Sequence, residues 1–190
     1  MSDTLIEDRI FQKIDFKTAG IEFAEYEYCK FEDCNFDNVV LNGNKFIDCT
    51  FLNCNLSLAK IENTMFQNCT FSNCKMLGLQ FPTANLFNIS FDFKSCILDH
   101  SSFAGLKLNK TKFNACRMHE ADFEETQLKE AIFENCDLLG ANFYHTQLQK
   151  ANFSTSYNFQ IVPEDNQITG AKFDLQSLPN LLSKYKLQIR

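Results

Sequence analysis

The sequence predicts an all-β solenoid built from square coils of 20 residues, and two periodicities support this prediction. Every fifth residue from Phe11 to Phe153 is Phe, Leu, Ile, Met or Tyr, with a single break in phase. A five-residue apolar period fits neither the 3.6-residue period of a helix nor the two-residue period of a strand. The cysteines supply the second period, because Cys29, Cys49 and Cys69 stand 20 residues apart. Four five-residue sides therefore make one coil.

Each five-residue unit has two inward and three outward positions. A small residue, most often Ala or Cys, stands two positions before most of the large apolar residues, and the other three positions are mostly polar. The 30 large inward positions hold 17 of the 21 Phe, which explains the unusual composition. At four units per coil, the 30 units predict about 7–8 coils.

The phase of the repeat moves by two residues between Phe91 and Cys96. One run of large inward residues ends at Phe91 and the next begins at Phe93, so the sequence leaves open which of the two fills the core. The slip predicts a bulge or short loop over residues 92–95. Interruptions of this kind often lie on the binding face of a repeat protein, and a harmless insertion is the alternative. The expected partner contacts at the slip, including an outward aromatic residue just before it, are Phe87, Asp92, Phe93, Lys94 and Ser95.

The two ends of the repeat are expected to differ from its middle. We expect an N-terminal cap over 1–10, the β-helix over 11–153, and an irregular last coil, capping helix and dimerisation tail over 154–190. Ser177 is suited to the N-cap position of the helix and Pro179 to its first turn, while residues 186–190 alternate like a strand. Open solenoid ends expose core, so apolar residues of the tail are needed to cover it. These residues are Leu178, Leu181, Leu182, Tyr185, Leu187 and Ile189.

The nine cysteines are interpreted as core residues. All of them occupy the small inward position, where a thiol behaves as a small hydrophobe, so their spacing reflects the repeat and not a metal site. Their odd number, together with an N-terminus that has no apolar run, predicts a reducing, cytoplasmic location. No segment approaches 18 apolar residues, and we expect neither a membrane span nor a metal or other cofactor.

The net charge of −6 argues against direct binding to nucleic acid, because phosphate binding needs a basic surface. Two interpretations of the dense acidic residues stay open, a solvated exterior or a surface that imitates DNA. Lys107, Lys110, Lys112 and Arg117 interrupt any uniform acidic stripe. We expect no enzyme, since the sequence lacks the common catalytic motifs and a convex solenoid offers no desolvated cleft. The acidic candidates for partner contact are Glu120, Asp122, Glu124 and Glu125.

Short Cys-x-Phe units identify a family resemblance. They include Cys29-Lys-Phe31 and Cys69-Thr-Phe71, and the chain ends in a Leu-rich segment over 181–187. The chain resembles the pentapeptide-repeat family over nearly its whole length, and in particular its quinolone-resistance (Qnr) group and the self-immunity proteins of microcin and albicidin producers. The resemblance implies a right-handed quadrilateral β-helix and a tail-to-tail homodimer made by a C-terminal helix.

The resemblance also implies a partner. Related proteins bind DNA gyrase or topoisomerase IV and protect the enzyme from quinolones or a peptide toxin, either as DNA mimics in its DNA-binding saddle or by displacing the poison. The large projecting loops of the well-studied Qnr proteins are absent here. The alternative is a non-enzymatic scaffold with another partner. A continuous acidic belt favours the topoisomerase role, and mixed charge with one apolar patch favours the scaffold.

Overall fold

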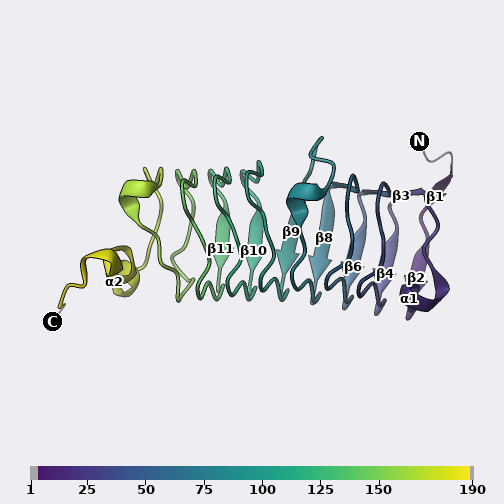
Figure 1. Ribbon diagram of the computed structural model, residues 1–190, viewed down its shortest axis with the longest axis horizontal. Helices are drawn as coiled ribbons and strands as arrows, with labels where there is room; N and C mark the ends of the chain where they lie inside the picture. Colours follow the sequence, from purple (N-terminus) through teal and green to yellow (C-terminus); the bar gives the residue numbers. More distant parts are fainter. Residues whose placement is uncertain (1–3, 189–190) are drawn as a thin grey trace.

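The protein is a long rod of stacked coils, with its two termini at opposite ends (Figure 1). The structure is a computed structural model that describes residues 4–188. Its strands are three or four residues long, and each pairs in parallel with strands of the neighbouring coils. The predicted all-β solenoid is therefore confirmed.

Two parallel sheets run along the rod, and their register follows the repeat. Tyr26 pairs with Phe46, and Phe46 with Phe66. The longer sheet has seven strands and spans about 6 turns, fewer than the 7–8 coils expected. Beyond β11, isolated bridges continue the same register, since Ile132 pairs with Asn152 and Asn152 pairs with Lys172. The shorter sheet contains β1 (Leu5–Glu7), β3 (Glu25–Glu27), β5 (Lys45–Ile47) and β7 (Met65–Gln67), and the longer one contains β2 (Ile10–Gln12), β4 (Lys30–Glu32), β6 (Thr50–Leu52), β8 (Cys69–Ser72), β9 (Phe91–Lys94), β10 (Lys112–Asn114) and β11 (Ile132–Glu134).

Stacked aromatic rings fill the interior. Along one column the rings of Phe31 and Phe51 lie 4.8 Å apart and nearly parallel, as do those of Phe113 and Phe133. Neighbouring columns meet edge to face, which is a favourable geometry for aromatic pairs. The small inward position also has a defined role, since the Cys49 thiol donates a hydrogen bond of 3.2 Å to the carbonyl of the preceding coil.

The corners of the coils use left-handed backbone. Asn and Asp are frequent there because they tolerate positive φ better than most residues, and all six glycines of the chain also have positive φ. At Gly43, with φ +72°, an added Cβ would lie 3.0 Å from Cε2 of Phe23. The Phe23 ring therefore lies over a corner that only glycine fits without strain.

The first coil begins inside the segment expected to form the N-terminal cap. β1 pairs with β3, which places Ile6 beside Tyr26. The guanidinium of Arg9 lies 5.2 Å from the centre of the Phe11 ring and helps to cover the end of the core. Two short helical turns, α1 (Phe16–Ala19) and η1 (Phe81–Thr83), replace strands elsewhere in the coil.

The sequence predicts a capping helix at the C-terminal end, and the structure has the short helix α2 within a series of short helical turns. These are η2 (Pro163–Asp165), η3 (Leu175–Ser177), α2 (Leu178–Leu181) and η4 (Ser183–Tyr185). Ser177 precedes α2 but makes no side-chain cap, and Asp174 instead caps η3 by accepting from the Gln176 amide at 3.0 Å. Residues 186–188 form no strand, so that expectation is wrong for the described part of the tail, and Ile189 lies outside the described residues.

Candidate interaction surfaces

The two extra residues of the slip lie before β9 and not within it. Met65 still pairs with Asn85, 20 residues later, whereas Cys69 pairs with Phe91, 22 residues later. β9 is a regular strand that pairs with β8 and β10. The bulge expected over 92–95 is therefore wrong, because the sequence pattern shows only where the new phase becomes visible and not where the chain departs from the old one.

Both Phe91 and Phe93 are in the core. Phe93 is 1 % exposed and stacks between two aromatic rings of β8 and β10, so it is not available as a surface contact. Phe91 occupies the column that holds Cys69 on the preceding coil, and its ring lies 5.0 Å from that of Phe81. Leu86, expected to point inward, is instead 52 % exposed. The large Phe91 ring thus fills space that Leu86 leaves empty.

Residues 85–90 form a projecting loop, which we call the slip loop. Figure 1 shows it in teal, rising from the rod between β8 and β9. Phe87 is 68 % exposed, as its outward position predicts, and lies next to the exposed Leu86. The loop is anchored at both ends, since the Phe87 amide donates to Asn85 Oδ1 at 3.0 Å and the Ser90 hydroxyl accepts from the Asn68 amide at 2.8 Å. Two apolar side chains are thereby held in solvent on an uncharged loop.

The remaining slip candidates lie on β9 and at the corner that follows it. Asp92 is half-buried, and its Oδ1 accepts a hydrogen bond of 2.9 Å from the Lys112 amide. Lys94 and Ser95 are exposed on the same coil. These three residues therefore follow the slip loop in the chain and are not part of it.

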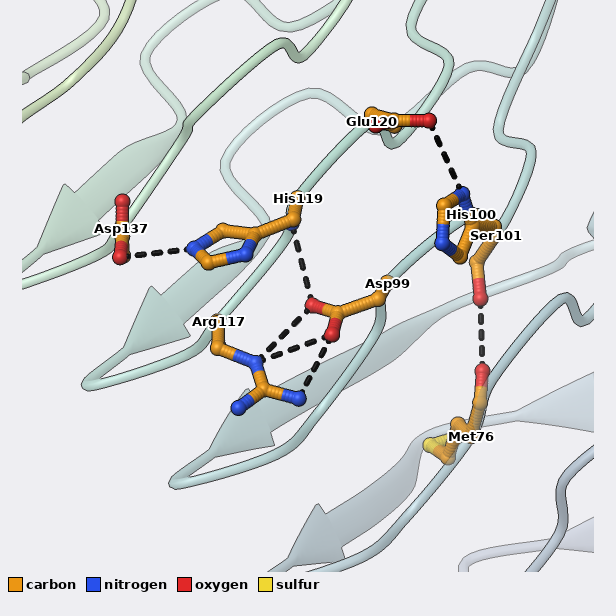
Figure 2. A network of polar contacts seen from close by, with 8 residues as sticks. All are labelled: Met76, Asp99, His100, Ser101, Arg117, His119, Glu120 and Asp137. Atoms are coloured by element: carbon orange, nitrogen blue, oxygen red, sulfur yellow. Dashed lines mark hydrogen bonds and ion pairs between the residues drawn. The ribbon is translucent and has the colours of Figure 1, made fainter.

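A polar network crosses three coils on another edge of the rod (Figure 2). Arg117 donates to Asp99 Oδ2 from Nε at 2.9 Å and from Nη2 at 2.6 Å, and the backbone amide of His119 donates to Asp99 Oδ1 at 3.1 Å. Asp99 is only 8 % exposed, so these partners compensate a charge that burial would otherwise penalise. Asp99 in turn raises the pKa of the Arg117 guanidinium.

Two histidines extend this network. His119 Nε2 lies 2.7 Å from Asp137 Oδ2, and His100 Nδ1 lies 3.3 Å from Glu120 Oε2. Burial of Asp137 opposes its ionisation, but hydrogen bonds from His119 and Asn158 outweigh it and hold the pKa of that carboxyl below its usual value. Glu120 is thus not an isolated charge.

The other acidic candidates for partner contact differ in their exposure and in the hydrogen bonds that they make. Asp122 is half-buried and accepts hydrogen bonds from Asn142 Nδ2 at 3.0 Å and from the Glu124 amide at 3.1 Å. Glu124 is half-buried, and Glu125 at the corner is exposed. Much of this acidic group is therefore engaged in contacts between coils.

Charge alternates in bands along the chain. Residues 1–48 contain 11 acidic and 5 basic residues, residues 49–119 contain 3 and 7, and residues 120–190 contain 10 and 6. The middle coils are basic and separate two acidic ends. Over residues 4–188 the charge is therefore mixed, and the basic middle band interrupts the acidic residues.

The C-terminal tail presents an apolar surface. Leu181 is half-buried against the last coil, as a cap requires. Other apolar side chains of the tail point to solvent, and we call this group the tail patch. It consists of Leu175, Leu178, Leu182, Tyr185 and Leu187.

The thiols lie in the core and have no disulfide partners. All nine are buried, and burial raises the pKa of the Cys49 thiol to about 12. Within residues 4–188, no group of three or more His, Cys, Asp or Glu side chains is arranged to hold a metal ion. Across the same residues, no helix has the length and apolar character needed to cross a membrane.

Comparison with known proteins finds a matching family profile and solved structures with a similar fold. The profile of the pentapeptide repeat region matches residues 24–92 and 90–153. A trypsin-treated variant of QnrB1, a plasmid-mediated fluoroquinolone resistance protein, is similar with a TM-score of 0.73 and 17 % identity, over 100 % of this chain and 92 % of QnrB1.

HetL, a pentapeptide repeat protein involved in heterocyst differentiation regulation in Nostoc sp. strain PCC 7120, is similar with a TM-score of 0.72 and 15 % identity, over 93 % of this chain and 89 % of HetL. Comparison with curated protein sequences finds no match. The structural likenesses establish a shared fold at low identity, and the profile covers most of the repeat. The chain belongs to the pentapeptide-repeat family.

Proposed function

We propose that this protein is a non-enzymatic binding rod whose partner is a type II topoisomerase, DNA gyrase or topoisomerase IV, which it protects from quinolones or a peptide toxin. The slip loop is the observation that carries the proposal. It holds Leu86 and Phe87 in solvent, and the core at that point is repacked by Phe91. A coil fold shared with a fluoroquinolone resistance protein over the whole chain supports the choice of partner.

The mixed charge favours contact through the slip loop over imitation of DNA. The basic middle band would be repelled from a DNA-binding saddle, and Glu120 and Asp122 are engaged between coils. An uncharged loop with two apolar side chains fits an apolar pocket of a partner protein, where buried aromatic residues contribute much of the binding energy. Glu124 and Glu125 would then serve as secondary contacts.

A gyrase supercoiling assay with and without a fluoroquinolone tests the proposal. The wild-type protein should restore supercoiling in the presence of the drug, and the double variant Leu86→Ser, Phe87→Ser should not. Tyr157→Ala is a matched control, because Tyr157 is a large side chain 50 % exposed on another part of the rod. Equal rescue by all three proteins would remove the slip loop from the contact, and no rescue by any of them would reject the topoisomerase as partner.

We also propose a tail-to-tail homodimer through the tail patch. Five large apolar side chains on so short a segment form a self-complementary surface of the kind that a twofold interface uses. Light scattering after size exclusion should give twice the chain mass of 22.0 kDa for the wild type and the single-chain mass for Leu182→Glu. A monomeric wild type would contradict this assembly.

A scaffold with another partner is the second candidate function. The mixed charge favours it, and HetL, whose fold this chain shares, is involved in regulation of differentiation. Affinity capture with the wild type and with the slip-loop double variant separates the two functions. A partner other than a topoisomerase, captured only by the wild type, would support the scaffold.

A further inference from the structure

The four sides of the rod do not end at the same coil. On three sides, isolated bridges continue to Tyr157, Gln167 and Lys172, whereas on the fourth side the last bridge joins Asp122 to Asn142. In the described part of the chain, Asn142 has no strand or bridge partner on its C-terminal side. One side of the rod therefore ends a coil early.

The backbone of residues 141–145 forms the end of this side, and we call it the open edge. On the preceding coil, the Phe123 amide donates a hydrogen bond of 2.8 Å to this backbone. The Ala141 carbonyl and the amides of Phe143 and His145 are the groups that would continue the ladder, and within residues 4–188 they have no backbone partner. Unpaired groups of this kind are what an added strand uses to join a sheet.

The turn η2 is the reason that the edge stays open. Val162 stands 20 residues after Asn142, and in a regular coil its carbonyl would accept from the Phe143 amide. That carbonyl instead accepts from the Asp165 amide at 3.2 Å and from Asn166 Nδ2 at 2.9 Å, both within or just after η2. The last coil thus satisfies its own backbone and leaves the open edge without a neighbour.

A cavity of about 290 Å³ lies against the open edge. Ala141 and Phe143, which are 6 % and 4 % exposed, contribute its apolar lining, and Gln160, Val162 and Asp165 of the last coil also line it. The cavity has the space for an added backbone segment, with one medium-sized apolar side chain against Phe143. The unpaired groups therefore face room that a short extended segment can fill.

The charges beside the open edge favour a basic segment. Asp122 and Glu124 lie on the preceding coil of the same side, and Asp165 lines the cavity. Residues 121–125 and 141–145 include no lysine or arginine. Glu164 of η2 differs from these carboxylates, because Lys184 of the tail approaches it to 3.9 Å.

Tyr144 adds a second reason for a basic segment. Its ring is 46 % exposed, lines the cavity and stands on the open edge itself. A cation beside an exposed tyrosine ring is attracted to its face, and arginine does this more often than lysine. An arginine placed next to Tyr144 would also point toward the carboxylates of the preceding coil.

We propose that the open edge binds an extended basic segment of a partner protein, which adds as a parallel strand like every other strand of the rod. The segment reads basic, apolar, basic. The first basic residue donates its amide to the Ala141 carbonyl and accepts from the Phe143 amide. The apolar residue packs on the Phe143 ring, and the second basic residue lies beside Tyr144 and accepts from the His145 amide.

Other segments fit the open edge less well. An acidic segment would meet Asp122, Glu124 and Asp165, and like charges in an interface disfavour binding. The chain's own residues 184–186 read Lys-Tyr-Lys, but they are engaged in the turn η4 and the residue after it. The proposal uses neither the slip loop nor the tail patch and goes beyond the proposed function.

Fluorescence anisotropy with a labelled peptide Gly-Gly-Arg-Val-Arg-Gly tests strand addition. N-methylation of the first arginine removes the amide that Ala141 accepts, and the dissociation constant should rise roughly tenfold. N-methylation of the glycine just before it is the matched control, because that amide points away from the open edge, and affinity should be unchanged. Equal affinity of the two methylated peptides would overturn the proposal.

A charge exchange tests the class of segment. The peptide Gly-Gly-Glu-Val-Glu-Gly should not bind the wild type but should bind the double variant Glu124→Lys, Asp165→Lys, which in turn should lose the arginine peptide. Glu62→Lys changes an exposed carboxylate on a distant coil and should bind like the wild type. Circular dichroism melting confirms that the variants are folded, and equal binding of both peptides by the wild type would overturn the basic preference.

Amide hydrogen exchange followed by NMR locates the peptide. In the free protein the amides of Phe143 and His145 should exchange quickly, whereas those of Phe123 and Glu125, which are paired, should exchange slowly. The arginine peptide should protect the first pair and leave the second unchanged. Slow exchange at Phe143 and His145 without peptide, or no added protection with it, would overturn the proposal. The assays contain no topoisomerase, so their outcome does not depend on the proposed function.

Discussion

Replacement of Phe91 by Ala tests how the rod accommodates its extra residues. Phe91 is 4 % exposed and stands in a column of small residues, so its loss opens a cavity beside Phe81 and Phe93. Replacement of a buried Phe by Ala lowers the free energy of unfolding by about 3–5 kcal/mol. At about 2–4 °C per kcal/mol for a domain of this size, the melting temperature should fall by about 6–20 °C.

A compensating deletion tests the same reasoning in the opposite direction. Removal of Phe87 and Asn88 restores the regular spacing and returns Leu86 to its inward position. With Phe91 retained, this coil becomes overpacked and should lose about 1–3 kcal/mol. Combined with Phe91→Cys, the deletion produces a regular coil with a cysteine in the Cys69 column, and stability should return close to that of the wild type.

Thermal and urea denaturation followed by circular dichroism measure all of these variants. The physical claim is that Phe91 and the slip loop compensate each other. A Phe91→Ala variant that loses less than about 1 kcal/mol would refute it. So would a deletion that is equally stable with Phe91 and with Cys at position 91, because the ring would then not compete with Leu86 for the same space.

Three further predictions concern the coil itself. Gly43→Ala should lower stability by about 1 kcal/mol or more, measured by urea denaturation, because its Cβ would meet the Phe23 ring at a positive φ; an unchanged midpoint would show that the corner relaxes freely. The pKa of Asp137 is lowered in the folded state, so its contribution to stability is present above an unfolded pKa of about 3.9 and is lost as the pH falls through the lower folded value. In Asp137→Asn the free energy of unfolding should therefore depend less on pH between about pH 5 and pH 2 than in the wild type. An unchanged pH dependence would show that the contact of Asp137 with His119 does not contribute to it. Native protein should react very slowly with Ellman's reagent, because all nine thiols are buried and burial raises the pKa of the Cys49 thiol to about 12. Denatured protein should react at all nine thiols. Rapid reaction of the native protein would contradict the burial of the cysteine columns.

The sequence by itself determined the coil. Its five-residue period decides which side chains face inward, and the 20-residue spacing of the cysteines fixes how many units make a turn. These patterns suffice because each coil contacts only its neighbours, so a local periodicity specifies the core without long-range information. The same period indicated that Phe87 points outward. Capping residues and helical spacing separately predicted the C-terminal helix, which the structure has as the short α2.

Only the tertiary structure decided where the slip loop lies and what fills the core beneath it. A change of phase is visible in the sequence only after it has occurred, whereas strand pairing shows that Asn85 still follows the old register and Phe91 the new one. The one sequence signal was a large residue, Phe91, 22 positions after Cys69 in a column of small ones. Contacts such as that of Arg117 with Asp99 depend on which side of the coil each residue occupies, and this becomes apparent only when the coils are stacked.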